Sequence, residues 1–135
     1  AAALGVADRI IWDLRFVAEE EIDAIFSTAS VVALPYRHSD QSGVLMTAVS
    51  YGKPVVASRI GGFEELIQDG VHGRLVEPEN PSALAAALAD VLEKRELTQK
   101  MEGAVRQLAI QWPSWDVIAR ETIRVYKNLR AHRAT

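Results

Sequence analysis

Ser42, Gly43 and Val44 follow a polar loop and begin an apolar segment in the middle of the chain. These residue types suit an anion site, because Ser42 or Gln41 can cap a helix and glycine lets a ligand approach the backbone closely. The first N–H groups of a helix have no partner within the helix, and the helix dipole adds to their positive potential. The segment predicts either a phosphate or diphosphate site or a capped helix without a ligand, and the residues alone leave both open.

A second loop, residues 58–65, carries Gly61 and Gly62 between an apolar run and the next helix. The two glycines permit a tight path for the backbone. Glu64 falls in the first helical turn, where we expect it to stabilise the helix rather than bind a ligand. Arg59 is long enough to reach a phosphate, but an arginine at the end of a strand is usually solvated.

The histidines do not indicate a catalytic or metal site. His38, Ser39 and Asp40 have the residue types of a catalytic triad, but neighbours in sequence point apart and rarely form a relay. No pair of histidines has the spacing of metal ligands, and the chain has no cysteine. We therefore expect no metal site and no disulfide.

Strands and helices alternate along the chain, which predicts an α/β fold with a partial Rossmann-like parallel sheet and flanking helices. Residues 31–34 are a continuous apolar run, typical of a strand buried on both faces. Asn80 and Pro81 have the types of an N-cap and a first helical residue. The expected strands are residues 9–14, 31–34, 54–57 and 73–76, and the short helices between them are residues 44–51 and 64–68.

The last helix carries a basic stripe opposite its apolar residues. The stripe is either a surface that attracts anionic lipid headgroups or a solvated face whose cations complement the helix dipole. We favour the solvated face, because the opposite residues are needed for the core. The basic residues are Arg120, Arg124, Lys127, Arg130 and Arg133, and the residues expected in the core are Ile118, Thr122, Val125 and Leu129.

The bulk composition fits one globular domain or part of one. The chain has 135 residues and a net charge of -3, which argues against a general nucleic-acid binder. It contains neither a signal peptide nor an apolar run of transmembrane length. A cytoplasmic protein is the default expectation, with peripheral contact at the inner membrane face if the basic stripe is used.

The order of these motifs resembles the donor-binding half of family 4 retaining glycosyltransferases, which have the two-domain GT-B architecture. The resemblance covers about residues 4–126. It rests on the motifs LPYR, QSGVLMTAVSYGKPVVAS, GG-x-x-E (Gly61, Gly62, Glu65), DGVHGRLVEP and W-x-x-I-A (Trp115, Ile118, Ala119).

The resemblance implies transfer of a hexose from a UDP- or GDP-sugar, with retention of anomeric configuration and without a metal or other cofactor. The acceptor would be a glycan, a lipid or a small molecule held by the N-terminal domain. The donor diphosphate would lie at the start of the helix at 44–51, where Ser42, Gly43 and Val44 match the family's backbone-amide positions.

The chain departs from the family's E-x7-E motif at both ends. Thr47 stands where the second glutamate would hold the ribose, and Ser39 stands where the first would contact the donor sugar. Asp40 lies one position further along and is a candidate to replace the first glutamate. A Gln-Ser-Gly variant of this segment, here Gln41-Ser42-Gly43, also occurs within the family. The substitutions favour one alternative, a non-catalytic glycosyltransferase-like interaction module. The other alternative is an unrelated doubly wound nucleotide or regulator domain.

The chain begins almost directly on a strand, and only about four strands are expected. We therefore expect residues 1–135 to be one truncated nucleotide-sugar-binding domain without its first strands and without the acceptor domain. The family's cationic pair comes from those first units, so the fragment alone is expected to be inactive. An exposed sheet edge would favour self-association.

Overall fold

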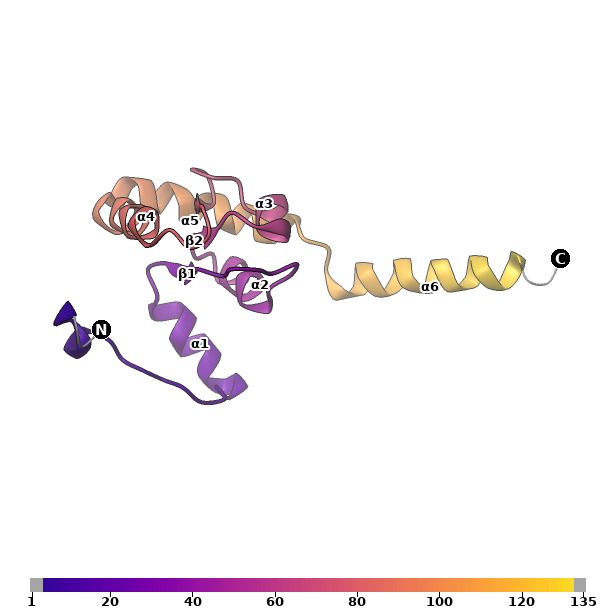
Figure 1. Cartoon of the computed structure of the whole chain (residues 1–135). Coiled ribbons are helices and arrows are strands. Elements are labelled where there is room, and N and C mark those ends of the chain that lie inside the picture. The colour runs from indigo at the N-terminus through magenta and orange to yellow at the C-terminus, as the bar shows by residue number, and fades with distance from the viewer. Residues whose placement is uncertain (1–3, 133–135) are drawn as a thin grey trace.

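Three short parallel strands form the centre of the fold, in the order β1-β2-β3 (Figure 1). They belong to a computed structural model that describes residues 4–132. The predicted α/β fold, a parallel sheet with flanking helices, is confirmed. The strands are β1 Val32–Leu34, β2 Val55–Ser58 and β3 Gly73–Val76; the helices are α1 Glu19–Thr28, α2 Gly43–Ser50, α3 Gly61–Leu66, α4 Pro81–Glu93, α5 Arg95–Gln111 and α6 Trp115–His132, with a 3-10 turn η2 at Ala7–Arg9.

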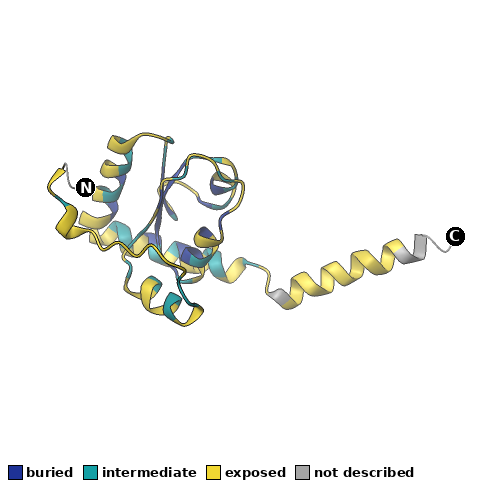
Figure 2. Ribbon diagram, turned by 60° about the horizontal axis from the view of Figure 1, so that its bottom comes forward, coloured by how far each residue is buried: buried dark blue, intermediate teal, exposed yellow. Residues whose placement is uncertain are grey.

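The middle strand β2 is buried along its whole length, as a continuous apolar run predicts (Figure 2). Val55 and Ala57 pack on one face with residues of α2 and α3, whereas Val56 packs on the other with residues of α4. Helix α2 connects β1 to β2, and α3 connects β2 to β3. Both connections are right-handed and the sheet grows in one direction, so the two helices lie on the same face of the sheet. The sheet therefore has two packed faces at β2, and its carboxyl edge lies beside the starts of α2 and α3.

Local signals account for the ends of several helices. Gly52 follows α2 with a φ of 65°, the left-handed conformation that glycine adopts readily after a helix. The side chain of Asn80 caps α4 by accepting a hydrogen bond from the Ala83 N–H at 3.0 Å, and Pro81 is the first helical residue. The cap at Asn80 and the proline at the first helical position agree with the sequence prediction. The short helix expected at 64–68 begins earlier, at Gly61, because the glycine loop itself enters the helical turn.

The strand predicted at 9–14 is wrong. This segment forms the turn η2 and then an extended chain without strand pairing, and its large apolar side chains are exposed: Ile11 by 96% and Phe16 by 92%. A strand needs a neighbouring strand to satisfy its backbone groups, and none of the described strands lies beside this segment. Its apolar sequence is therefore insufficient to make it a strand here.

Burial of β1 on both faces is also wrong. Leu34 is buried, but Ala33 is exposed although it pairs with the fully buried Val56 of β2. The strand lies at the edge of the described sheet, and α4 covers β2 and β3 instead. One face of β1 therefore has no helix over Ala33.

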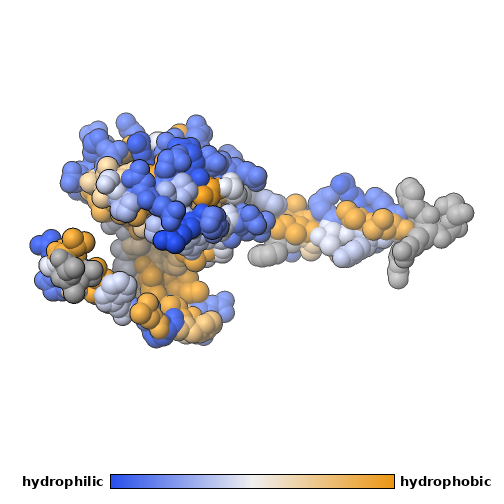
Figure 3. Space-filling model, viewed as in Figure 1, coloured by the Kyte–Doolittle hydropathy of each residue, from blue (hydrophilic) through white to orange (hydrophobic). Residues whose placement is uncertain are grey.

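The expected packing of the last helix on the core is not observed. Helix α6 extends away from the sheet, and Ile118, Val125 and Leu129 are exposed by 40%, 54% and 58% (Figures 1 and 2). Figure 3 shows hydrophobic surface along this helix. The periodicity correctly predicts an amphipathic helix, but it does not identify what covers the apolar face. No helix within residues 4–132 is both long and apolar enough to cross a membrane.

Candidate functional site

The candidate anion site lies in a cleft of about 480 Å³ between the start of α2 and α3. It is at the carboxyl edge of the parallel sheet, where ligands of open α/β folds bind. The predicted residues Asp40, Gln41, Ser42 and Gly43 all line it. The other lining residues are Leu45, Met46, Gly62, Phe63, Glu65 and Leu66.

Helix α2 begins beside this cleft with two free amide groups, of which only that of Gly43 belongs to a lining residue. Ser42 is 9% exposed, and its hydroxyl accepts a hydrogen bond from the Leu45 N–H at 3.2 Å, so Ser42 rather than Gln41 is the cap. The N–H groups of Gly43 and Val44 have no hydrogen-bond partner among the described residues. Because nothing lies within 4 Å of the position that a Cβ of Gly43 would take, a ligand can reach the backbone there. This arrangement favours an anion with two acceptor oxygens.

The glycine loop and the polar loop pack backbone against backbone. A Cβ at Gly62 would lie 2.2 Å from the Asp40 carbonyl oxygen, and one at Gly61 would lie 3.1 Å from the Ser39 carbonyl oxygen. Only glycine at 62 allows the two loops to approach this closely. The two glycines of GG-x-x-E therefore shape the cleft by fixing the position of residues 39–40.

The cleft has no positive side chain of its own. Its lining includes the carboxylates Asp40 and Glu65 but no lysine or arginine. The hydroxyl of Ser39 donates to the Gln41 carbonyl oxygen at 2.8 Å, and no hydrogen bond joins His38, Ser39 and Asp40 as a relay. The attraction for a diphosphate thus comes from backbone N–H groups, and two nearby carboxylates oppose it.

Thr47 lies one turn along α2 and lines a different, adjoining cleft of about 430 Å³. Its hydroxyl donates to the Gly43 carbonyl oxygen at 2.9 Å, so its lone pairs remain to accept a hydrogen bond from a ligand. Trp112 and Pro113 form part of the same cleft. The structure therefore divides the predicted site residues between two neighbouring clefts, and Val44 contributes to neither lining.

Arg59 is partly exposed, with 37% of its side chain accessible, but it is paired rather than free. Its guanidinium lies 3.5 Å from Glu64, 3.6 Å from Asp69 and 3.4 Å from Glu77, and it donates to the Leu75 carbonyl oxygen at 3.3 Å. Glu64 thus has an ionic partner besides its place at the start of α3. Three carboxylates already surround this cation, so Arg59 is a structural residue that ties the glycine loop to β3.

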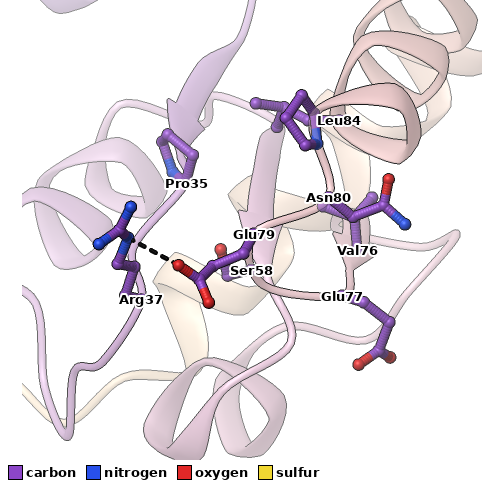
Figure 4. A pocket seen from close by; sticks show the side chains of 9 residues that line it. Pro35, Arg37, Ser58, Val76, Glu77, Glu79, Asn80 and Leu84 are labelled. Atoms are coloured by element: carbon purple, nitrogen blue, oxygen red, sulfur yellow. Dashed lines mark ion pairs between the residues drawn. The ribbon is translucent and has the colours of Figure 1, made fainter.

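The structure reveals a polar cavity that the sequence did not predict, on the other side of the carboxyl edge (Figure 4). Arg37 and Glu79 form an ion pair across it, with Nε and Oε1 3.1 Å apart. Ser58, at the end of β2, lies in its wall. Strand alternation could have indicated Ser58, since a polar residue ends an apolar run, but the Arg37–Glu79 pair joins distant loops. No group of three or more metal-ligating side chains that could hold an ion occurs in the described part of the chain.

His72 does not act as a charged group at neutral pH. Its Nδ1 accepts a hydrogen bond from the Gln68 N–H at 3.1 Å, which requires that nitrogen to be unprotonated. Partial burial lowers the pKa of His72 below its usual 6.5. The imidazole is therefore a neutral part of the turn before β3.

Residues 1–94 match the family described as glycosyl transferases, group 1. A D-inositol 3-phosphate glycosyltransferase of Streptomyces griseus is 36% identical over 129 residues, which are 93% of this chain and 26% of that protein. An MMP alpha-(1->4)-mannosyltransferase of Mycolicibacterium hassiacum is 31% identical over 127 residues, which are 93% of this chain and 31% of that protein. The chain spans about a quarter to a third of the length of the curated relatives it matches.

Solved structures show the same fold. The structure of Anabaena Alr3699/HepE in complex with UDP has a TM-score of 0.79 and 27% identity, covering 96% of this chain and 34% of that one. Sucrose-phosphate synthase from Thermosynechococcus elongatus has a TM-score of 0.87 at 24% identity, covering 97% of this chain and 33% of that one. The chain therefore belongs to the group 1 glycosyl transferases and has the fold of the C-terminal domain of a GT-B glycosyltransferase.

Proposed function

We propose that this chain is the donor-binding part of a longer glycosyltransferase, and that the cleft between α2 and α3 binds the diphosphate of a UDP- or GDP-sugar. The observation that carries the proposal is the pair of unpartnered N–H groups at Gly43 and Val44 in the first turn of α2, together with the open space beside Gly43. A structural neighbour with 26% identity was solved in complex with UDP-glucose, which supports a nucleotide sugar as the ligand class.

In this proposal each α2 residue has a separate role. The Gly43 and Val44 N–H groups donate to phosphate oxygens, and Ser42 keeps the helix start in place through its cap. Thr47 accepts a hydrogen bond from a ribose hydroxyl in the adjoining cleft. Asp40 is the carboxylate nearest in sequence to the position from which the family's first glutamate contacts the donor sugar.

The proposed reaction is the transfer of a hexose to a glycan, lipid or small molecule, with retention of configuration and without a metal. The departing nucleoside diphosphate carries charge that must be neutralised in the transition state. The cleft lining contains two carboxylates and no cation, so we assign that neutralisation to groups outside these 135 residues. The 135-residue chain alone is accordingly expected to transfer no sugar.

Isothermal titration of the full-length protein with UDP and GDP tests this proposal. We expect one of the two to bind with a dissociation constant in the micromolar range, and Gly43→Pro to weaken it. Proline at the first helical position removes this N–H without breaking the helix, and Ser42 already has the extended backbone (φ -138°, ψ 115°) that proline requires of its predecessor. Gly43→Ala, which keeps the N–H, is the matched control. Binding of neither nucleotide would exclude a donor site.

A non-catalytic glycosyltransferase-like interaction module is the second candidate. It is favoured by Ser39 and Thr47 at the motif positions and by the net negative lining of the cleft. Release of UDP or GDP from a panel of donors by the full-length protein distinguishes the two. Release from any donor supports the enzyme, and its absence across the panel supports the module.

A further inference from the structure

The side chain of Ser58 has no hydrogen-bond partner. The residue as a whole is 2% exposed, its side chain makes no hydrogen bond to any described residue, and its hydroxyl oxygen is open to the cavity. It ends the central strand β2 and lies in the wall of the polar cavity of about 360 Å³ shown in Figure 4. The hydroxyl is therefore free to donate to, or accept from, a molecule in the cavity.

The cavity is polar but its charges are paired. The Arg37 guanidinium pairs with Glu79 at 3.1 Å, and the carboxylate of Glu77 lies 3.4 Å from Arg59 on the outer side. The lining thus carries one net negative charge, from Glu77, Glu79 and Arg37, and both of its carboxylates have an ionic partner. A phosphate would lack a free cation, and a cationic ligand would lack a free carboxylate, so the cavity favours a neutral polar ligand.

The arrangement of donors and acceptors fits a saccharide. Arg37 and Glu79 place a donor beside an acceptor, which matches the two neighbouring hydroxyls of a vicinal diol. Ser58 can donate to or accept from a third hydroxyl. Pro35 and Leu84 add apolar wall against which the C–H face of a sugar ring can lie (Figure 4).

The conformation of Glu79 supports a built site. Its φ of 57° makes it the one described non-glycine residue in the left-handed region. Such strain persists where the surroundings determine it, often at ligand sites. Here the strained backbone directs the carboxylate across the cavity to Arg37.

We propose that the cavity formed by Arg37, Ser58 and Glu79 is a second ligand site, which binds the hydroxyls of a neutral saccharide. It lies apart from the α2–α3 cleft, with which it shares no lining residue. The proposal does not depend on nucleotide binding. Its failure and the failure of the donor site are therefore separate results.

Saturation-transfer NMR on the full-length protein tests the site, with methyl-α-D-glucoside, methyl-α-D-mannoside and myo-inositol as probes. We expect at least one probe to give a saturable signal that an excess of UDP or GDP does not remove. Ser58→Ala should weaken that binding by about two- to tenfold, the effect of one hydrogen bond. Glu79→Asn should weaken it as well, since asparagine tolerates the left-handed backbone but cannot pair ionically with Arg37.

Two controls keep this test specific. Ser58→Ala should not lower the unfolding midpoint, because the hydroxyl has no partner to lose. Thr28→Val removes an exposed hydroxyl that bonds only within α1, to the Ala24 and Ile25 carbonyl oxygens, and should leave saccharide binding unchanged. No signal from any probe, which would leave only water in the cavity, overturns the proposal. So does a signal that survives both Ser58→Ala and Glu79→Asn, or that nucleotide displaces.

Discussion

Gly62→Ala tests whether the close contact between the glycine loop and the polar loop shapes the cleft. The added Cβ would lie 2.2 Å from the Asp40 carbonyl oxygen, whereas ordinary contacts begin near 3.4 Å, so the loop must move by about 1.2 Å. The atoms in contact at this point belong to the backbone, so they cannot rotate away as a side chain can. Overpacking of this kind destabilises a protein by about 1–3 kcal/mol.

The matched control is Gly103→Ala in α5, where a Cβ meets nothing within 4 Å. Gly103→Ala lies in the interior of α5 and should gain about 1 kcal/mol of helix propensity, whereas Gly62 lies in the first turn of α3, so the control shows what alanine does where no neighbour is in the way. Thermal unfolding should show Gly103→Ala at or above the wild-type midpoint and Gly62→Ala lower than Gly103→Ala by ~3–15 °C. Equal midpoints for the two variants would refute the close packing of the loops.

Three further predictions concern the helix starts and the exposed apolar surface. Ser42→Ala removes the cap of α2 and should lower the free energy of unfolding by about 1 kcal/mol in urea titration, and an unchanged value contradicts the cap. Arg15 holds the pKa of the Glu21 carboxyl at about 2, so the stabilisation by this pair is present above about pH 4.5 and is lost towards pH 2. Arg15→Ala should raise the pKa of Glu21 in an NMR titration, and no rise would contradict the pairing. Exposed Ile11 and Phe16 and the free edge of β1 should cause association of the 135-residue chain, and a constant monomer mass in light scattering across concentrations argues otherwise.

Elements specified by local chemistry were predictable from the sequence. The strand at 73–76 and the cap at Asn80 agree with the structure because turn and cap residues act within a few positions. The segment 9–14 has strand composition, but pairing depends on a neighbour that composition cannot supply. Helix α6 likewise has the expected amphipathic pattern. The spacing of its own apolar residues does not identify the surface against which they pack.

The sequence predicted where the candidate cleft lies on the sheet but not its detailed geometry, and the binding roles of its residues stay predictions. The loop–helix pattern correctly placed Ser42 and Gly43 together at the carboxyl edge of the sheet. Thr47 falls in a separate cleft because α2 turns it away from that lining. The cavity at Arg37 and Glu79 could not be foreseen, since it depends on how two distant loops meet.

A crystal structure of the full-length protein with UDP or GDP, whichever binds in titration, would locate the diphosphate. We expect phosphate oxygens at hydrogen-bond distance, about 2.7–3.2 Å, from the backbone nitrogens of Gly43 and Val44. We also expect the ribose beside Thr47 in the adjoining cleft. A bound nucleotide that leaves both N–H groups without a phosphate contact would refute the proposed donor site.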